Sequence, residues 1–573
     1  MKNRTASVTS VALWFALVGC ENVHKQPGTQ SEDGGSSTSG GSSTSGGSSA
    51  SGGSSASGGS STSGCSSASG GSSASGGSSC VSSVLLGDPS CSADGNVVKF
   101  DECGREIVIQ ACVAAAKGGN CKAATCGCKA GFTGSNCDPI TSCAVYVKAL
   151  GSDDRDGSNW QQALGTVQAG LDLAATKALP SAPCEVWVAQ GTYYPTLDVS
   201  GLDPTGKPRT KTIRLRANVN LYGGFAGTEA VRTGRDHVAY PTILSGDLGV
   251  TGNLVDGDNA YHVVTGANSS LIDGFTITLG NANANDDSPN SMGGGMYNDS
   301  VAPTVTDCTF TNNYGDTGGG MFNTNSASPI VTNSTFRDNR ANYNCAGMCI
   351  LNRSAPTLKS CTFRHNLTTQ NGSGLTIGNF SNPVVLGCSF EQNSAISGGG
   401  VMIFGNSEPQ LRSCTFSGNS SSYRGGAIYN VGASNSTVLN CTVFGNSAEN
   451  GGGGLYVEDS SPAITNCIFW GNRSGTVKTT SSITNGSELL VPIDSVVTYS
   501  DVEGGCTVAS GCTTDATGNI DTDPLFDKTS VDGLSLTSGS PCIDKGNSDI
   551  ATSFDKNGNT RVGIADMGAY EYR

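Results

Sequence analysis

A repeat of 25 to 27 residues runs from Gly293 to Gly475 and occurs seven times. One position of the repeat is asparagine in every copy: Asn313, Asn339, Asn366, Asn393, Asn419, Asn446 and Asn472. Repeats of this length made of short apolar runs indicate a solenoid, because one coil cannot bury its own apolar face. Equivalent residues of successive coils are then expected to stack about 4.8 Å apart, the spacing between paired strands.

Four other positions of the repeat are expected to face the interior. The first holds Met296, Met321, Met348, Leu375, Val401, Ile428 and Leu455, and the second holds Val305, Val331, Leu358, Val385, Leu411, Val438 and Ile464. The third holds Cys308, Ser334, Cys361, Cys388, Cys414, Cys441 and Cys467, and the fourth holds Phe310, Phe336, Phe363, Phe390, Phe416, Val443 and Phe469. We interpret the cysteines as small buried residues. Stacked side chains that point the same way do not suit a disulfide torsion, so free thiols are expected.

The second and third positions lie three residues apart, which does not fit the two-residue period of a strand. A corner is therefore expected just before the third position, at Asp307, Asn333, Ser360, Gly387, Ser413, Asn440 and Asn466. Most of these residues tolerate a left-handed backbone. Three short strands and three turns per coil predict an all-β fold, a right-handed parallel β-helix of about 26 residues per coil. The asparagines are expected to form a ladder of stacked amides.

The first 20 residues are typical of a signal peptide, with Lys2 and Arg4 before an apolar run too short to span a membrane. The run ends in Leu17-Val18-Gly19-Cys20, which resembles the lipobox of bacterial lipoproteins. That resemblance implies lipidation of Cys20 and an anchor in a bacterial envelope. Glu21 after the cysteine favours sorting to the outer membrane of a Gram-negative cell, and we expect the protein to be exposed on the surface. An ordinary signal peptide is the alternative. Residues 21–79, rich in Gly and Ser, predict a flexible tether.

Residues 80–142 hold eight cysteines, a density typical of small disulfide-rich extracellular modules. The spacing from Cys121 to Cys137, with Gly131-Phe132-Thr133-Gly134, resembles the end of an EGF-like domain. That resemblance implies three disulfides: Cys103–Cys121, Cys112–Cys126 and Cys128–Cys137. A spacer without a ligand is the alternative, and no calcium is expected there.

Residues 143–290 predict an N-terminal cap followed by the first coils. The expected strands are Ala144–Lys148 and Glu185–Ala189, preceded by Cys143 and Cys184. These two cysteines are expected to form a disulfide. Between the strands a helix is predicted from Ser158, with apolar residues at Trp160, Leu164, Val167 and Leu171. An amphipathic helix at this place would cover the open end of the solenoid.

Two segments near the start, Val186–Pro195 and Tyr222–Glu229, resemble the opening coils of bacterial surface β-helix proteins. The regular coils occupy residues 291–475, and residues 476–573 are expected to contain C-terminal coils. The ending, with Asp523–Phe526 and Asp566–Tyr572, resembles the choice-of-anchor Q domain. That resemblance implies a β-helix of the pectate-lyase type whose relatives use differing envelope anchors. The Phe-x-x-Asn repeats also resemble those of polymorphic outer-membrane proteins, a group associated with adhesion.

One charged cluster is a weak catalytic candidate. Between the phenylalanine and asparagine positions of three successive coils lie Arg337-Asp338, Arg364-His365 and Glu391-Gln392. A polysaccharide lyase or glycoside hydrolase on this fold needs clustered carboxylates, or a base with a neutralising partner. We interpret the cluster as charges on a solvated turn, and we expect no catalytic or cofactor-binding residue.

Other classes of function find little support. The chain has four His and lacks the HExxH, GxSxG and P-loop motifs. A net charge of −15 argues against nucleic acid as a partner. Asp286-Asp287 and Asp555-x-Asn557-Gly558-Asn559 are weak Ca²⁺ candidates that read more simply as polar turns. One aromatic column, Tyr297, Phe322, Tyr429 and Tyr456, could face solvent. We expect a structural, adhesive or glycan-binding protein whose partner is a surface polysaccharide or protein; the alternative is a polysaccharide lyase or hydrolase.

Overall fold

The computed structural model describes residues 143–573, except residues 205, 250–256, 287, 476–478, 481–482, 486–495 and 505–517. It also describes the backbone of seven short strands before residue 143: β1 (Leu85–Cys91), β2 (Val97–Asp101), β3 (Glu106–Gln110), β4 (Gly119–Lys122), β5 (Thr125–Cys128), β6 (Phe132–Thr133) and β7 (Asp138–Pro139). The predictions for the signal peptide, the tether and the side chains of the cysteine-rich module lie outside the described residues. No helix in the described part is long and apolar enough to cross a membrane.

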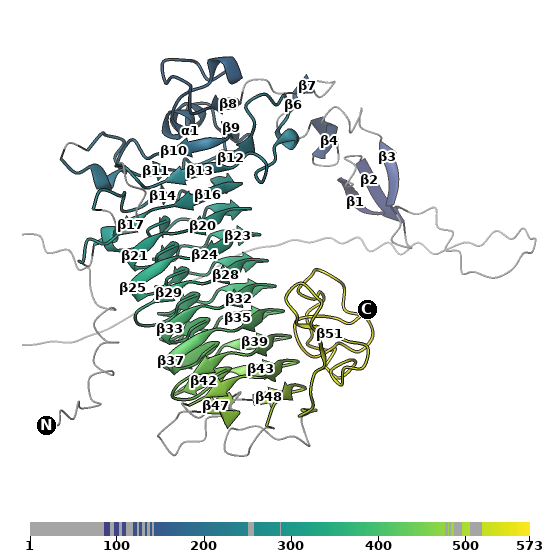
Figure 1. The fold of residues 1–573 in the computed structure, drawn as a ribbon. Helices are drawn as coiled ribbons and strands as arrows, with labels where there is room; N and C mark the ends of the chain where they lie inside the picture. The colour runs from purple at the N-terminus through teal and green to yellow at the C-terminus, as the bar shows by residue number, and fades with distance from the viewer. Residues whose placement is uncertain are drawn as a thin grey trace, which may run out of the picture. The chain divides into compact units, whose positions relative to one another are not determined.

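A parallel β-helix forms the main body of the described chain (Figure 1). Its strands belong to four stacked sheets, which we number in their order along a coil.

The first sheet contains β11 (Ile213–Arg214), β14 (Val264–Thr265), β18 (Met296–Asp299), β22 (Met321–Thr324), β26 (Met348–Ile350), β30 (Leu375–Ile377), β34 (Val401–Ile403), β38 (Ile428–Val431), β42 (Leu455–Glu458) and β47 (Ile483–Asn485). The second contains β8 (Ala144–Val147), β9 (Cys184–Ala189), β12 (Val219–Phe225), β15 (Leu271–Asp273), β19 (Thr304–Thr306), β23 (Ile330–Thr332), β27 (Thr357–Lys359), β31 (Val384–Leu386), β35 (Gln410–Arg412), β39 (Thr437–Leu439), β43 (Ala463–Thr465) and β48 (Val496–Thr498).

The third sheet contains β10 (Gly191–Tyr193), β13 (Thr242–Ser245), β16 (Phe275–Thr278), β20 (Thr309–Thr311), β24 (Thr335–Arg337), β28 (Thr362–Arg364), β32 (Ser389–Glu391), β36 (Thr415–Ser417), β40 (Thr442–Phe444), β44 (Ile468–Trp470) and β49 (Asp501–Val502). The fourth contains β17 (Asn281–Ala282), β21 (Tyr314–Thr317), β25 (Arg340–Asn344), β29 (Leu367–Thr368), β33 (Ser394–Ser397), β37 (Ser420–Arg424), β41 (Ser447–Ala448), β45 (Arg473–Ser474) and β46 (Thr479–Thr480), of which β46 is antiparallel to β45.

The expectation of three strands per coil was wrong, because a fourth strand follows each asparagine. Its buried side chains are small, as at Ala341, Thr368, Ala395, Ser421 and Ala448. Small and hydroxylated residues make no apolar column in the sequence, so the repeat pattern did not indicate this strand.

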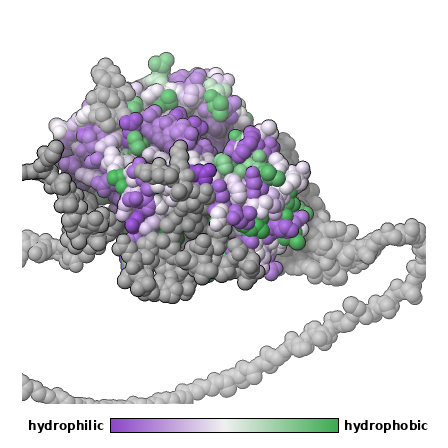
Figure 2. All heavy atoms as spheres, turned by 60° about the horizontal axis from the view of Figure 1, so that its bottom comes forward, coloured by the Kyte–Doolittle hydropathy of each residue, from purple (hydrophilic) through white to green (hydrophobic). Residues whose placement is uncertain are grey.

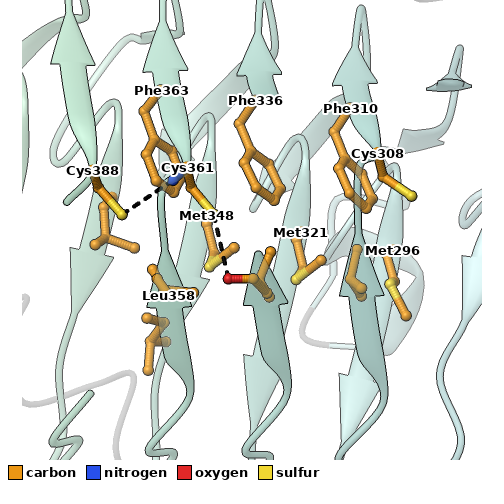
Figure 3. Close-up of a cluster of buried hydrophobic side chains, with 14 of the residues drawn as sticks. Met296, Cys308, Phe310, Met321, Phe336, Met348, Leu358, Cys361, Phe363 and Cys388 are labelled. Atoms are coloured by element: carbon orange, nitrogen blue, oxygen red, sulfur yellow. Dashed lines mark hydrogen bonds between the residues drawn. The ribbon is translucent and has the colours of Figure 1, made fainter. Parts of the chain in front are cut away.

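The core consists of the four predicted columns, which stack in register (Figure 3). Phe310, Phe336, Phe363, Phe390 and Phe416 form a ladder with ring centroids 4.7 to 5.0 Å apart. The six cysteines of the third column are buried free thiols. Their sulfurs accept hydrogen bonds from one neighbouring coil and donate to carbonyls of another, as Cys361 does to the Val331 oxygen at 3.4 Å. Ser334 takes the same place with a hydroxyl, because both groups can donate and accept.

The predicted corner between the second and third sheets is confirmed. All seven residues there have positive φ, from 49° at Asp307 to 62° at Gly387. A second left-handed corner, between the third and fourth sheets, comes just before the asparagine column, at Asn312, Asp338, His365, Gln392, Gly418, Gly445 and Gly471.

The asparagines are buried and bridge successive coils along the axis. The Asn366 Nδ2 atom donates to Asn393 Oδ1 at 2.9 Å, and the Asn366 backbone N–H donates to the same oxygen. A further bond runs from Asn393 Nδ2 to the Phe363 carbonyl at 2.9 Å. Each amide therefore satisfies backbone groups at the turn and links its coil to two neighbours.

The N-terminal end of the β-helix is covered by α1 (Val167–Ala175), whose Val167, Leu171 and Ala174 join the core. The predicted start of this helix at Ser158 was wrong. Trp160 lies in a short 3-10 turn (Trp160–Gln162), and the helix begins after Thr166, whose hydroxyl accepts a hydrogen bond from the Ala169 N–H. The strands at either side agree with expectation, and a disulfide joins Cys143 to Cys184.

The outer face of the first sheet is covered, which the sequence did not indicate. Phe322, Tyr429 and Tyr456 have exposed fractions of 3, 7 and 4%, so the expectation that their column could face solvent was wrong for these three. The Arg424 guanidinium lies 4.6 Å from the Tyr456 ring and pairs with Glu458. In one coil the aromatic residue is replaced by Cys349, which forms a buried disulfide with Cys345. The position of Cys345 is glycine in the other regular coils.

Residues 518–573 fold into what we call the C-terminal lobe, which packs on the outside of the last coils (Figure 1). Its strands are β50 (Phe526–Asp527) and β51 (Ser535–Leu536). Three of the predicted corner residues bind it. Ser413 contacts Thr552 at 2.9 Å, Asn440 accepts from the Thr552 N–H at 3.0 Å, and Asn466 makes two hydrogen bonds to the Asn547 backbone.

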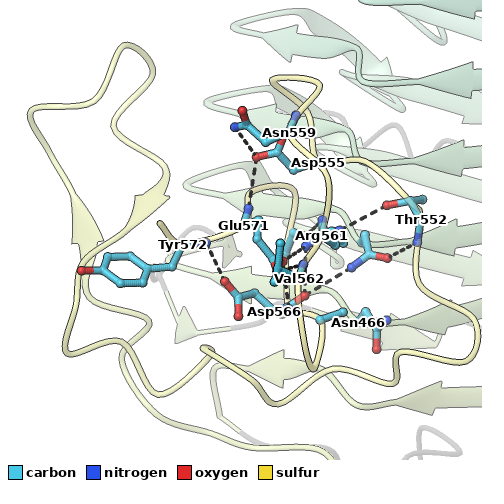
Figure 4. A network of polar contacts seen from close by, with 12 residues as sticks. Asn466, Thr552, Asp555, Asn559, Arg561, Val562, Asp566, Glu571 and Tyr572 are labelled. Atoms are coloured by element: carbon cyan, nitrogen blue, oxygen red, sulfur yellow. Dashed lines mark hydrogen bonds and ion pairs between the residues drawn. The ribbon is translucent and has the colours of Figure 1, made fainter. Parts of the chain in front are cut away.

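The Asp566–Tyr572 motif also contacts these corners, because the Asn440 Nδ2 atom donates to the Asp566 carbonyl at 3.3 Å (Figure 4). The Gly568 N–H donates to the Asn466 carbonyl, and φ at Gly568 is 92°. A Cβ atom at Gly568 would lie 2.7 Å from Ile468 Cδ1. Glycine is therefore required both by the backbone conformation and by the close approach to the wall of the β-helix.

The buried Asp501 makes stability depend on pH in a predictable way. Burial raises the pKa of Asp501 to about 7, against about 3.9 in an unfolded chain, while the Cys542 thiol donates to its Oδ2 atom. Between these pH values the folded chain keeps a proton that the unfolded chain has lost. The contribution of Asp501 to stability therefore falls as pH rises from about 4 to 7, by at most about 4 kcal/mol.

We expect Asp501→Asn to flatten this part of the pH dependence, measured as the thermal midpoint of wild type and variant from pH 4 to 8. Buried His262, whose pKa burial lowers to about 4, has the opposite slope below about pH 6.5 and is common to both proteins. The difference between the two curves therefore isolates Asp501. Parallel curves would contradict the assignment.

Candidate functional site

The charged cluster predicted from the sequence is assembled on three successive coils. Arg337, Arg364 and Glu391 are in register at the ends of β24, β28 and β32. The Arg337 guanidinium pairs with the Asp338 carboxylate at 2.7 Å. The His365 Nδ1 atom lies 3.8 Å from Asp338 Oδ1, and its Nε2 atom contacts Gln392 Oε1 at 2.5 Å. Arg337, Asp338, His365 and Gln392 form a half-exposed row of mutual contacts along the left-handed corner, and Arg364 and Glu391 lie beside it in register.

The C-terminal lobe explains why this row does not continue beyond Glu391. In the next three coils the same outward position holds Ser417, Phe444 and Trp470. Phe444 packs edge-on against Phe526 of the lobe at 5.4 Å, and Lys528 lies 4.4 Å from the Phe444 ring. The column is charged where solvent reaches it and becomes small and then aromatic where the lobe covers it.

A groove with a volume of about 660 Å³ runs along the fourth sheet. Residues of β29, β33, β37, β41 and β45 line it, which are neighbouring strands of five successive coils. At about 4.8 Å per strand the lining extends about 19 Å along the axis. None of Arg337, Asp338, Arg364, His365 and Glu391 lines this groove.

The groove occurs where two neighbouring columns lose their large side chains. The outward column of the fourth sheet begins with Tyr314, Arg340 and Leu367 and then becomes Ser394, Ser420 and Ser447. The adjacent corner column carries Asn312, Asp338, His365 and Gln392 and then becomes Gly418, Gly445 and Gly471. Both changes occur between the coil of His365 and the coil of Gly418. The hollow therefore results from a change of residue type within the repeat.

Seven of the fifteen residues that line the groove bear a hydroxyl group, and the lining carries little charge. The Ser420 hydroxyl donates to the Ser394 oxygen at 3.1 Å, so the hydroxyls of two successive coils are linked. Among the described residues of the lining, Glu449 is the single acidic side chain and Arg473 the single basic one. The Arg473 guanidinium already lies 3.6 Å from the Glu503 carboxylate. The groove can therefore form many neutral hydrogen bonds, and the part of its lining that the structure describes holds no pair of carboxylates.

The two weak Ca²⁺ candidates are polar turns as far as the structure describes them. Asp555 accepts hydrogen bonds from the Asn559 N–H at 2.7 Å and from Asn559 Nδ2 at 3.0 Å. Asp286 accepts from the backbone and hydroxyl of Ser288, and the neighbouring Asp287 lies outside the described residues. Across the described ranges, no three His, Cys, Asp or Glu side chains are placed to hold a metal ion.

Comparison with known proteins places the fold. The family model described as "Right handed beta helix region" matches residues 245–397 and 344–520. The chain folds as a right-handed β-helix.

Two solved structures with a similar β-helix were found at low similarity. The crystal structure of pectate lyase Pel9A has a TM-score of 0.35 and 13% identity, covering 76% of this chain and 98% of that one. Escherichia coli YbhC has a TM-score of 0.26 and 14% identity, covering 61% of this chain and 80% of that one. The comparison with curated proteins yields no match. At these values the likeness carries no argument about activity.

Sequence reasoning found the charged row but missed the groove. Its floor belongs to the strand that the repeat pattern did not reveal. The signal that could have found it is the change from side-chain-bearing residues to glycine just before the asparagine column, at Gly418, Gly445 and Gly471. In the sequence, glycines at a left-handed corner indicate only a turn. The outward serines beside them show that these glycines also leave a hollow in the surface.

Proposed function

We propose that this protein is an envelope-anchored β-helix, exposed at the cell surface, with an adhesive or glycan-binding role. The observation that carries the proposal is the groove of the fourth sheet, which combines a hydroxyl-rich lining with a single carboxylate, Glu449. Glycosidase catalysis needs a second carboxylate at a defined separation, and a lyase needs a base with a neutralising partner. A groove without these groups suits retention of a polymer rather than its cleavage.

The disulfides support export from the cytoplasm. Disulfides persist in oxidising compartments and are rare in the cytosol. Both Cys143–Cys184 and the fully buried Cys345–Cys349 lie within the β-helix. Together with the lipobox-like segment ending at Cys20 and the Gly/Ser-rich residues 21–79, they support a protein that is lipidated and held off the membrane by a tether.

The surface also suits a polar partner. On the face shown in Figure 2, hydrophilic residues predominate among the described residues and the apolar ones form small separate patches. Large contiguous apolar patches mark many protein-binding surfaces. The visible face therefore favours contacts made through hydrogen bonds.

Deletion of the gene is expected to reduce adhesion of whole cells to a polysaccharide-coated surface or to neighbouring cells. A plasmid copy of the wild-type gene should restore adhesion, whereas a Cys20→Ser copy, which cannot be lipidated, should not. Unchanged adhesion after deletion would sink the proposal.

The enzyme alternative makes a separate prediction at the charged row. If the protein were a lyase or hydrolase acting there, Arg364→Ala or Glu391→Ala would abolish release of uronate from a polysaccharide. We expect instead that the wild-type protein releases neither unsaturated nor reducing ends from acidic or neutral polysaccharides, with or without Ca²⁺. Release by wild type that disappears in either variant would establish the enzyme.

A further inference from the structure

We infer that the groove of the fourth sheet binds an uncharged polysaccharide chain that lies parallel to the axis of the β-helix. The inference rests on the proposed function and names its ligand class and its site. The argument for the orientation is geometric. Five neighbouring strands line the groove, and four of them, β29, β33, β37 and β41, contribute small residues at equivalent positions of successive coils, so the hollow is long in the axial direction. A linear polymer can then meet one coil after another.

The backbone of the floor argues against a peptide. Extended peptides are commonly bound by adding a strand to a free sheet edge. Here β33, β37 and β41 are central strands of the fourth sheet, paired on both sides. The groove therefore presents side chains of a sheet face, and a peptide could not form the main-chain hydrogen bonds of strand addition.

The side chains of the lining favour hydroxyl-rich partners. Ser394, Ser420 and Ser447 occupy one outward column in register, and Thr369 and Ser422 also border the groove. A hydroxyl is one donor and two acceptors, so a row of hydroxyls can meet the hydroxyls of a sugar chain in either role. The exposed apolar side chain of Ile396 offers contact to the C–H faces of the rings.

The charges favour a neutral ligand over a polyanion. Arg473 is the basic residue of the lining and is engaged by Glu503. Glu449 adds a negative charge, and the chain carries a net charge of −15. A uronate polymer or a nucleic acid needs several free cations, because phosphate or carboxylate neutralisation dominates the affinity of such ligands.

The repeat itself supplies groove-filling substitutions that the fold already accepts. Tyr314 occupies the outward position of Ser447 five coils earlier in the column, so Ser447→Tyr places an existing residue type at an equivalent site. Asn312 occupies the corner position of Gly445 with φ of 53°, and a Cβ at Gly445 meets nothing within 4 Å. Gly445→Asn is therefore a second, independent way to fill the groove. Thr357→Tyr, on the exposed face of the second sheet, is the matched control.

The test is affinity electrophoresis of the full-length chain in native gels containing dextran, mixed-linkage β-glucan, xylan, galactomannan or polygalacturonate. Wild type and Thr357→Tyr should be retarded by at least one neutral polysaccharide, and Ser447→Tyr and Gly445→Asn should bind it about tenfold more weakly. Thermal midpoints of all four proteins show whether each variant is folded.

Three results would overturn the inference. Equal retardation of all four proteins would place binding elsewhere. Retardation by polygalacturonate alone would replace the neutral ligand with an acidic one. Absence of retardation on every gel would remove polysaccharide as the ligand. The proposed adhesive role would stand or fall separately, by the whole-cell assay of the deletion strain.

Discussion

Replacement of Asn393 by alanine is expected to destabilise the β-helix by about 4 kcal/mol. Asn393 is fully buried, and its Oδ1 atom accepts from the backbone and side-chain nitrogens of Asn366 at 3.1 and 2.9 Å. Its Nδ2 atom donates to the Phe363 carbonyl and to Asn419 Oδ1, both at 2.9 Å. Alanine removes the partner of the buried Asn366 N–H and the amide bond to the Phe363 carbonyl, and it leaves Asn366 Nδ2 and Asn419 Oδ1 with one hydrogen bond fewer. Each buried group left unsatisfied costs about 1–3 kcal/mol.

The effect should be local before it is global. Stability in a solenoid is carried by contacts between neighbouring coils, so hydrogen exchange should accelerate first in the coils of Asn366, Asn393 and Asn419. Asn382→Ala is the matched control, because Asn382 is exposed and makes one hydrogen bond, from the Glu408 N–H to its side-chain oxygen. The control should cost less than about 1 kcal/mol. Equal losses in the two variants would show that the ladder adds nothing beyond an ordinary surface contact.

The second large effect is expected at Arg561, which holds the C-terminal lobe together. Arg561 and Glu571 pair at 3.0 Å with side-chain exposures of 4% each. The guanidinium also donates to the carbonyls of Asp566 and Gly568, in the segment that touches the β-helix. Arg561→Met leaves a buried carboxylate without its cation, which costs about 3–5 kcal/mol.

Detachment or unfolding of the lobe is the expected consequence. It would expose Phe444 and Ile468, which pack against the lobe. Limited proteolysis should then cleave within residues 518–573 while the coils stay protected. Arg573→Met is the matched control, since Arg573 is exposed and its one hydrogen bond goes to the Thr560 carbonyl. The double variant Arg561→Met/Glu571→Gln should recover part of the loss, because it removes the stranded charge. A protease-resistant Arg561→Met lobe would contradict this account.

The repeat allowed much of the fold to be predicted. A column of one residue type at a constant spacing can be produced only by stacking, so the ladders of phenylalanine, cysteine and asparagine follow from the pattern. The corner at Asp307 and its equivalents follows from a spacing of three between inward positions. These are local arguments, since each needs only one coil and its copies.

The strand after the asparagine column could not be predicted in this way. Its inward residues, such as Ala395 and Ser421, are small and do not stand out from a turn. The groove depends on that strand, and so the most useful binding surface was hidden. The charged row was visible because charge is conspicuous in sequence, yet it makes contacts mainly within itself.

The sequence by itself determined the repeat, the stacking of like on like, and hence the class of fold, because burying each coil requires a neighbour. Only the tertiary structure decided which columns face solvent. The lobe contacts Ser413 and Asn440, which precede its contacting residue by more than 100 positions in the chain. It therefore covers Phe444 and leaves Arg364 exposed. Contacts between residues so far apart in the chain produce no periodic pattern in the sequence. Which part of the surface stays exposed therefore depends on which distant segment packs against it.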